Sequence, residues 1–255
     1  MFESYDKTKV QRVETEEPEK IIAPEDLCVS EEDIAKMENR IKKDLESGHF
    51  FSALPNIAVL RIYDPDFRVE LTADQKSRLE AIFLEKPKNE DDVVEWYFDL
   101  VLAKGLFKDL LVPNWSDQED KVKESVRNEA EKDSAGYVVG ELLLRSCGSG
   151  LSLLDIPGFD PKSLEKELED YKKRDEWGDY AQLAGAMTSL FNDFKVPLDT
   201  IDWDEVRATL GRLEKMDSLF EKFCLMISIE KLRAADKKLK MDEKANPPIP
   251  IARKF

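Results

Sequence analysis

His49 is the only histidine in this 255-residue chain, so any chemistry that needs an imidazole has to use it. It closes the segment Glu46-Ser-Gly-His49, which has the Glu-x-x-His spacing of di-iron helical bundles. A di-iron site requires two copies of that motif, and a Ser-His or Cys-His pair requires a supporting signature that the sequence lacks. We therefore expect His49 to be a surface residue in a turn, and we assign no catalytic residue and no metal ligand.

The segment Leu153-Leu-Asp-Ile-Pro-Gly158 resembles the Asp-x-x-Gly switch segment of GTPases, in which the aspartate serves the magnesium ion. The resemblance covers about six residues, and the loop Gly-x-x-x-x-Gly-Lys-Ser/Thr that would cradle the phosphates is absent. We interpret the segment as a turn before a helix that begins near Asp160, and we predict no cofactor.

Acidic side chains form several short clusters, none of which has the central glycine and terminal glutamate of a calcium loop. The clusters are Asp64/Asp66, Asp91/Asp92 and Asp199/Asp202/Asp204. We interpret most of them as helix caps, because carboxylates accept hydrogen bonds from the free N–H groups at a helix start. Carboxylates that are buried together can also perform acid–base chemistry. An enzyme or small-molecule binder with a carboxylate-lined pocket between helices therefore stays open as the alternative function.

The three cysteines, Cys28, Cys147 and Cys224, have no metal-binding or redox spacing, and their odd number argues against a disulfide framework. Cys147 precedes a glycine turn. Cys224 lies on an apolar helical face, where we expect a small buried hydrophobic residue.

A polar start that can cap a helix recurs along the chain in steps of about 42 to 45 residues. These starts lie near Ser30, Thr72, Asp117, Asp160 and Asp202. Apolar residues follow each start with the three- and four-residue spacing of one helical stripe, as in Ile34, Met37, Ile41 and Leu45. After a polar break, a second and more apolar helix is expected, which begins at an aromatic residue in every unit. The aromatic residues are Phe51, Tyr97, Tyr137, Tyr180 and Phe220.

The period predicts an all-α protein, a right-handed stack of about five antiparallel helical hairpins with no sheet. It resembles the architecture of HEAT-type repeats over roughly residues 30–240, and the match of residues 66–71 to residues 193–198 supports the repetition. A bundle of amphipathic helices without true repeats would also produce a weak period. Residues 1–29 are predicted to be an acidic flexible tail, and residues 241–255 a proline-containing flexible tail.

The net charge of −16 disfavours nucleic-acid binding, which needs clustered lysines and arginines. It is compatible with a basic protein partner, or with solubility alone. No apolar run approaches the roughly 18 residues of a membrane span, and the first residues lack an apolar signal core. We therefore expect a cytoplasmic monomer that does not contact membranes.

Together these patterns predict a noncatalytic protein-interaction module whose binding surface is the inner face of a curved stack. Trp115 follows Pro113-Asn114 in a predicted loop and is the candidate partner anchor. Trp96, Trp177 and Trp203 are expected in the core. A peptide-like ligand in the carboxyl-terminal tail is the other candidate, formed by Pro247, Pro248 and Pro250. A subunit of a larger complex, docked through its tails, is a further alternative.

Overall fold

The computed structural model describes residues 24–84, 90–112, 134–148, 161–191 and 194–245. Over these residues the chain is all-α: it forms nine α-helices and one short 3-10 helix, and no strand. The helices are α1 (Glu31–Ser47), α2 (Phe50–Tyr63), α3 (Ala73–Leu84), α4 (Glu90–Leu106), α6 (Ser134–Ser146), α7 (Pro161–Lys173), α8 (Trp177–Leu190), η1 (Leu198–Thr200), α9 (Trp203–Lys215) and α10 (Leu219–Ala245). Within this part of the chain, no helix is long and apolar enough to cross a membrane.

Side-chain caps begin the helices where the sequence predicts them. Ser30 and Asp33 form a reciprocal capping box at α1. Thr72 and Gln75 exchange the same pair of hydrogen bonds at the start of α3, at 3.2 and 2.9 Å. Asp202 accepts hydrogen bonds from two main-chain N–H groups of α9. The capping prediction is therefore confirmed at these three starts, while Asp117 and Asp160 lie outside the described residues.

The turns that join α1 to α2, α7 to α8 and α9 to α10 have the same geometry. Each contains one residue in the left-handed conformation, namely Gly48 (φ 79°), Asp175 (φ 56°) and Asp217 (φ 56°). In each turn the next residue donates its N–H to the carbonyl five positions earlier, at 2.8 to 3.0 Å, which is the Schellman pattern of helix ends. Asp175 follows Gly48 by 127 residues, and Asp217 follows Asp175 by 42. These intervals fix how the three hairpins correspond residue by residue.

This correspondence corrects the expectation that an aromatic residue opens every second helix. Tyr97 lies well inside α4, which begins at Glu90, and α6 begins at Ser134. Phe51 is 47% exposed whereas Tyr180 is buried, so the two do not occupy equivalent positions. The physical reason is that the turn, and not the aromatic residue, sets where the second helix starts.

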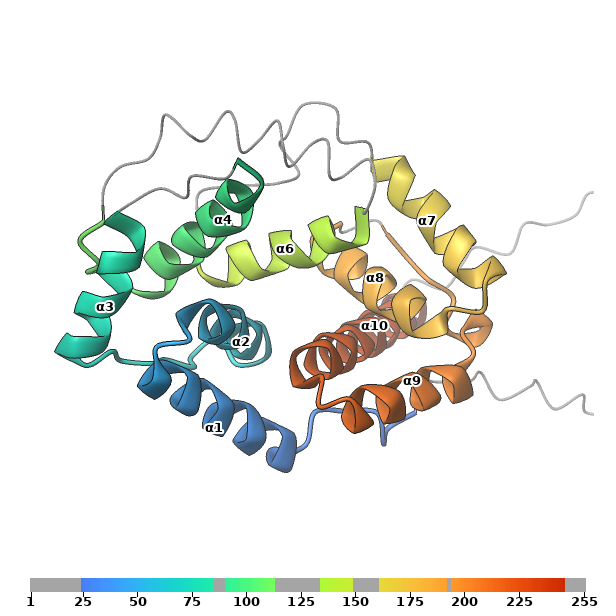
Figure 1. The fold of residues 1–255 in the computed structure, drawn as a ribbon. Helices are drawn as coiled ribbons and strands as arrows, with labels where there is room; N and C mark the ends of the chain where they lie inside the picture. Colours follow the sequence, from blue (N-terminus) through green and yellow to red (C-terminus); the bar gives the residue numbers. More distant parts are fainter. Residues whose placement is uncertain (1–23, 85–89, 113–133, 149–160, 192–193, 246–255) are drawn as a thin grey trace, which may run out of the picture.

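Helices α2, α6, α8 and α10 lie inside, and α1, α3, α4, α7 and α9 surround them (Figure 1). The inner helices contact one another, α2 with α6 and α10, and α8 with α6 and α10. Their buried residues belong to one hydrophobic core. The binding surface on the inner face of a curved stack stays a prediction. Trp96, Trp177 and Trp203 are buried in this core, as predicted.

The first and last hairpins meet. Val29 donates its N–H to Glu230 at 3.0 Å, and Lys222 forms an ion pair with Asp33 at 2.9 Å. Leu27 and Val29, which the sequence assigned to the tail, are buried, and α10 continues to Ala245, beyond the predicted boundary at 240. The first two helices thus contact the last helix through apolar side chains and a pair of opposite charges.

Candidate functional site

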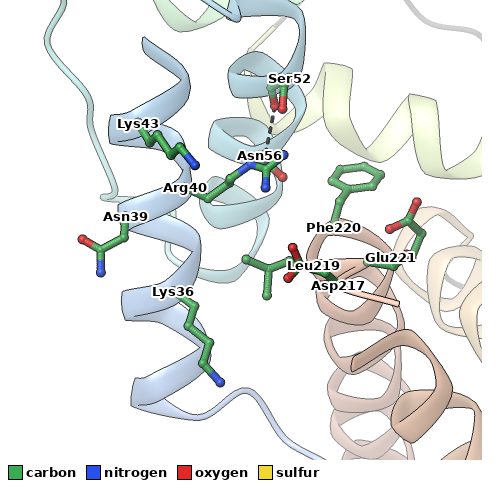
Figure 2. A pocket seen from close by; sticks show the side chains of 11 residues that line it. Lys36, Asn39, Arg40, Lys43, Ser52, Asn56, Asp217, Leu219, Phe220 and Glu221 are labelled. Atoms are coloured by element: carbon green, nitrogen blue, oxygen red, sulfur yellow. Dashed lines mark hydrogen bonds between the residues drawn. The ribbon is translucent and has the colours of Figure 1, made fainter. Parts of the chain in front are cut away.

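A groove of about 580 Å³ lies where the first and last hairpins meet, between α1, α2 and the turn that joins α9 to α10 (Figure 2). Its lining residues come from these three places and from the start of α10: Lys36, Asn39, Arg40, Lys43, Ser52, Asn56, Asp217, Ser218, Leu219, Phe220 and Glu221. The groove depends on the contact between α1, α2 and α10, since its two walls are far apart in the sequence.

A polar network ties the α1 wall to the α2 wall. The buried carboxylate of Asp44 accepts hydrogen bonds from Arg40 Nε at 3.2 Å and from Ser52 Oγ at 2.7 Å. The main-chain oxygen of Ser52 in turn accepts a hydrogen bond from Asn56 Nδ2 at 2.9 Å. Asp44 is thus satisfied by two donors, and the network holds the side chains of Arg40 and Asn56 in place at the groove.

Asn56 is the residue in this network whose side chain has a buried atom without a hydrogen-bond partner. It is only 7% exposed, and its Oδ1 is buried with no hydrogen-bond partner. The hydrogen bond to Ser52 identifies which end of the amide is the nitrogen, so the atom left over is an acceptor. A buried acceptor without a donor costs free energy, which makes this oxygen the most informative atom of the groove.

The correspondence between hairpins shows that Asn56 departs from the pattern of its own fold. Counting from the left-handed turn residue, the position of Asn56 is occupied by Leu183 in α8 and by Leu225 in α10. Both leucines are 1% exposed. An apolar residue therefore fits this helical position, and packing alone does not require the amide.

The two walls of the groove carry opposite charges. Lys36, Arg40 and Lys43 recur at the four- and three-residue spacing of one face of α1. Asp217 and Glu221 lie on the other wall, beside the apolar side chains of Leu219 and Phe220 (Figure 2). Lys36 also pairs with Glu32 at 2.9 Å, and Glu32 raises the pKa of the Lys36 ammonium. The groove can therefore hold a ligand with hydrogen-bond donors, an apolar part and charges of both signs.

Two other grooves resemble each other. One lies between α1 and the segment that follows α2, and the other lies between α7 and the segment that follows α8. Their volumes are about 300 and 670 Å³. Seven lining positions of the first recur 127 residues later in the second: Glu38/Glu165, Ile41/Leu168, Lys42/Glu169, Phe67/Phe194, Arg68/Lys195, Val69/Val196 and Glu70/Pro197. The same local structure is thus built twice.

Asp99 in α4 is the carboxyl group with the most altered acidity in the described part of the chain. Burial, with a smaller contribution from the negative charge of Glu95, raises the pKa of Asp99 to about 7. A carboxyl group with such a pKa exchanges its proton near neutral pH, as general acids and bases do.

The structure places the residues singled out in the sequence as follows. His49 is exposed at the turn between α1 and α2, as expected. Cys224 is buried, also as expected, and burial raises the pKa of its thiol to about 12. The candidate partner-binding residues Trp115, Pro247, Pro248 and Pro250 lie outside the described residues, as does the segment Leu153–Gly158. Among the described residues, no three His, Cys, Asp or Glu side chains are grouped so that they could hold a metal ion.

Sequence reasoning missed Asn56. The signal that could have found it is a polar residue inside the apolar stripe of the second helix, at the position that Leu183 and Leu225 occupy in the later hairpins. Seeing that signal requires the hairpins to be aligned correctly with one another. Aligning them on their aromatic residues gave the wrong alignment. Comparison with protein-family models, curated proteins and solved structures found no match to this chain.

Proposed function

We propose that the protein is a noncatalytic protein-interaction module, built from about five tandem helical hairpins in a right-handed, HEAT-like arrangement. The observation that carries the proposal is the groove between the first and last hairpins. It combines the buried, unpaired acceptor of Asn56 with walls of opposite charge and an apolar part. A polypeptide segment supplies all the complementary groups at once, because it has main-chain N–H groups and side chains of each kind.

Three features support the tandem repeat. The left-handed turn residue recurs at Gly48, Asp175 and Asp217 with the same hydrogen bonds. The helices α2 and α8 end at equivalent residues, Asp64 and Phe191, whose backbone angles agree within about 10° (φ −120°, ψ 99° and φ −118°, ψ 108°). The two corresponding side grooves repeat seven positions. Unrelated helices of a simple bundle have no reason to share turns, helix ends and groove linings.

We propose that the partner is another protein, and not a nucleic acid or a membrane. We also propose that this chain is a monomer. Over the molecule as a whole, the net charge of −16 favours a basic partner. The groove is different, since one of its walls presents three cations, of which Lys36 is paired with Glu32 and Arg40 with Asp44. We propose a cytoplasmic location, where the three free cysteines would stay reduced.

The test of the proposal is affinity recovery from native cell extract, with the full chain as bait and mass spectrometry as the readout. We expect one protein to be recovered in stoichiometric amount, and not to be recovered by an unrelated helical bait of similar net charge. Recovery of no partner, together with a melting temperature that rises with a metabolite, would contradict the proposal and favour a ligand-binding protein or an enzyme.

The observation that favours an enzyme is Asp99, whose pKa of about 7 suits proton transfer. If Asp99 serves an active site, Asp99→Asn should abolish the ligand-induced rise in melting temperature or the turnover of that ligand. If it is only a partly buried carboxyl group, the substitution should change stability alone.

A further inference from the structure

The amide of Asn56 defines what a ligand of the groove must offer. Its Nδ2 is engaged with the Ser52 carbonyl, so the Oδ1 that remains can only accept a hydrogen bond. A ligand must therefore bring an N–H or O–H donor to this buried point. A carboxylate or a phosphate alone brings no such donor. A site that bound only such anions would use the cations of α1 and would not need an amide in place of the leucine of the other hairpins.

The cations define the second requirement. Lys36 and Lys43 lie seven residues apart on α1, which is about 10 Å along a helix. Charges beyond about 8 Å are largely screened at physiological salt. Distant acidic charge therefore matters little to a ligand in the groove. Glu32 and Asp44 are close, however: they already pair with Lys36 at 2.9 Å and with Arg40 at 3.2 Å, so a carboxylate of the ligand would share these two cations with them.

Resting on the function proposed above, we infer that the groove binds an extended, acidic segment of a protein partner. A main-chain N–H of the segment donates to Asn56 Oδ1, and its carboxylates contact Lys36, Arg40 and Lys43. In an extended chain, alternate side chains point to the same side and lie about 7 Å apart. Two acidic residues at alternate positions of the segment thus match the α1 wall.

The opposite wall limits the composition of this segment. Asp217 and Glu221 repel carboxylates, so the side chains between the acidic positions are apolar, polar or basic. Apolar ones would contact Leu219 and Phe220. The recognised segment is therefore acidic on one side only, and a uniformly acidic run of residues fits the groove less well.

The experiment is selection of a random twelve-residue peptide library displayed on phage, with the full chain immobilised. Recovered peptides are then synthesised, and their affinities are measured by fluorescence anisotropy for the wild type and for three variants. Asn56→Leu removes the acceptor, and Lys43→Glu reverses one charge of the α1 wall. Lys166→Glu makes the same charge change at an exposed residue of α7, outside the groove, and serves as the control.

We expect the recovered peptides to be enriched in Asp or Glu at alternate positions. Their affinity should fall about tenfold in Asn56→Leu and in Lys43→Glu, and should stay unchanged in Lys166→Glu. Melting temperatures of all variants show that the losses do not come from unfolding.

Two outcomes would overturn the inference. If the recovered peptides lack acidic residues, or bind Asn56→Leu and Lys43→Glu as well as the wild type, the groove is not the site, although the chain still binds polypeptides. If no peptide is recovered, the groove does not bind peptide segments. The proposed function is then tested separately, by whether affinity recovery from extract yields a folded protein partner.

Discussion

Asn56 is the only polar residue among those that α2 buries, and its position in α8 and α10 is taken by leucine. A buried acceptor that has no donor lowers stability, whatever other role the residue has. Asn56 therefore supports the proposed binding role, and it also leads to a prediction about stability that is independent of any partner.

We predict that Asn56→Leu raises the free energy of unfolding by about 1 kcal/mol, because it removes a buried oxygen that has no partner. Urea denaturation of the two proteins measures the difference. A loss of stability instead would show that the amide of Asn56 is needed by the fold and would remove the main argument for the groove.

Asp99 makes the stability depend on pH. Its pKa in the folded protein, about 7, lies above its ordinary value of 3.8 because the side chain is partly buried and lies near the negative charge of Glu95. Between these values the folded state holds a proton that the unfolded state has released, so stability falls as pH rises from about 4 to about 7. Asp99→Asn should leave stability at pH 4 nearly unchanged and increase it at pH 8, as followed by thermal denaturation. An equal effect at both pH values would contradict the assignment.

The three cysteines differ in exposure, and the number of exposed thiols can be measured with a thiol reagent. Cys28 is exposed, whereas Cys147 and Cys224 are buried, and burial raises the pKa of both buried thiols. Since the thiolate is the reactive form, we predict that Ellman's reagent modifies one thiol of the native protein at pH 8 and three after denaturation. Rapid reaction of a second native thiol would show that the core around α6 or α10 opens readily.

At the scale of helices, close packing depends on small residues at particular crossings. A Cβ atom added at Gly185 of α8 would lie 2.3 Å from the main-chain oxygen of Ser228 in α10. The absence of a side chain at Gly185 therefore allows α8 and α10 to approach closely. A Cβ atom at Gly211 of α9 would meet nothing within 4 Å.

These two glycines therefore predict opposite effects of the same substitution. Gly185→Ala should lower the free energy of unfolding by about 1 to 3 kcal/mol, because the two helices must move apart. Gly211→Ala should raise it by up to about 1 kcal/mol, because alanine favours a helix over glycine. Denaturation of both variants measures these changes. Similar effects of the two substitutions would contradict the close approach of α8 and α10 at Gly185.

At the scale of the whole molecule, the contact between the first and last hairpins decides the shape and creates the groove. Its central ion pair, Asp33 to Lys222, is largely buried, with side chains 10% and 13% exposed. By contrast, the pair of Asp26 with Arg207 is open to solvent, at 64% and 44%. Both pairs join the amino-terminal region to the last hairpin, so they form a natural comparison.

We predict that Asp33→Asn lowers the free energy of unfolding by about 3 kcal/mol at most, because Lys222 loses its buried partner and keeps only the exposed Glu214, at 3.5 Å. Asp26→Asn should change it by less than about 1 kcal/mol. Burial alone would raise the pKa of Asp33, but hydrogen bonds from Ser30 and Lys222 outweigh it and lower the pKa below 3.8. The stability that Asp33 contributes should accordingly be lost as pH falls through that lowered value. If the two variants are equally stable, the contact between the first and last hairpins does not depend on the buried pair.

Local sequence signals determined the helical nature of the chain, the caps at Ser30, Thr72 and Asp202, and the burial of Trp96, Trp177 and Trp203. Each depends on neighbours within a turn or two of helix, where a cap or a three- to four-residue spacing is sufficient. The tertiary structure decided the register between hairpins, the contact between the first and last hairpins and the groove with Asn56. These depend on contacts such as Lys222 with Asp33, 189 residues apart. Helical periodicity sets which face of a helix is apolar, but it does not specify which distant helix covers that face.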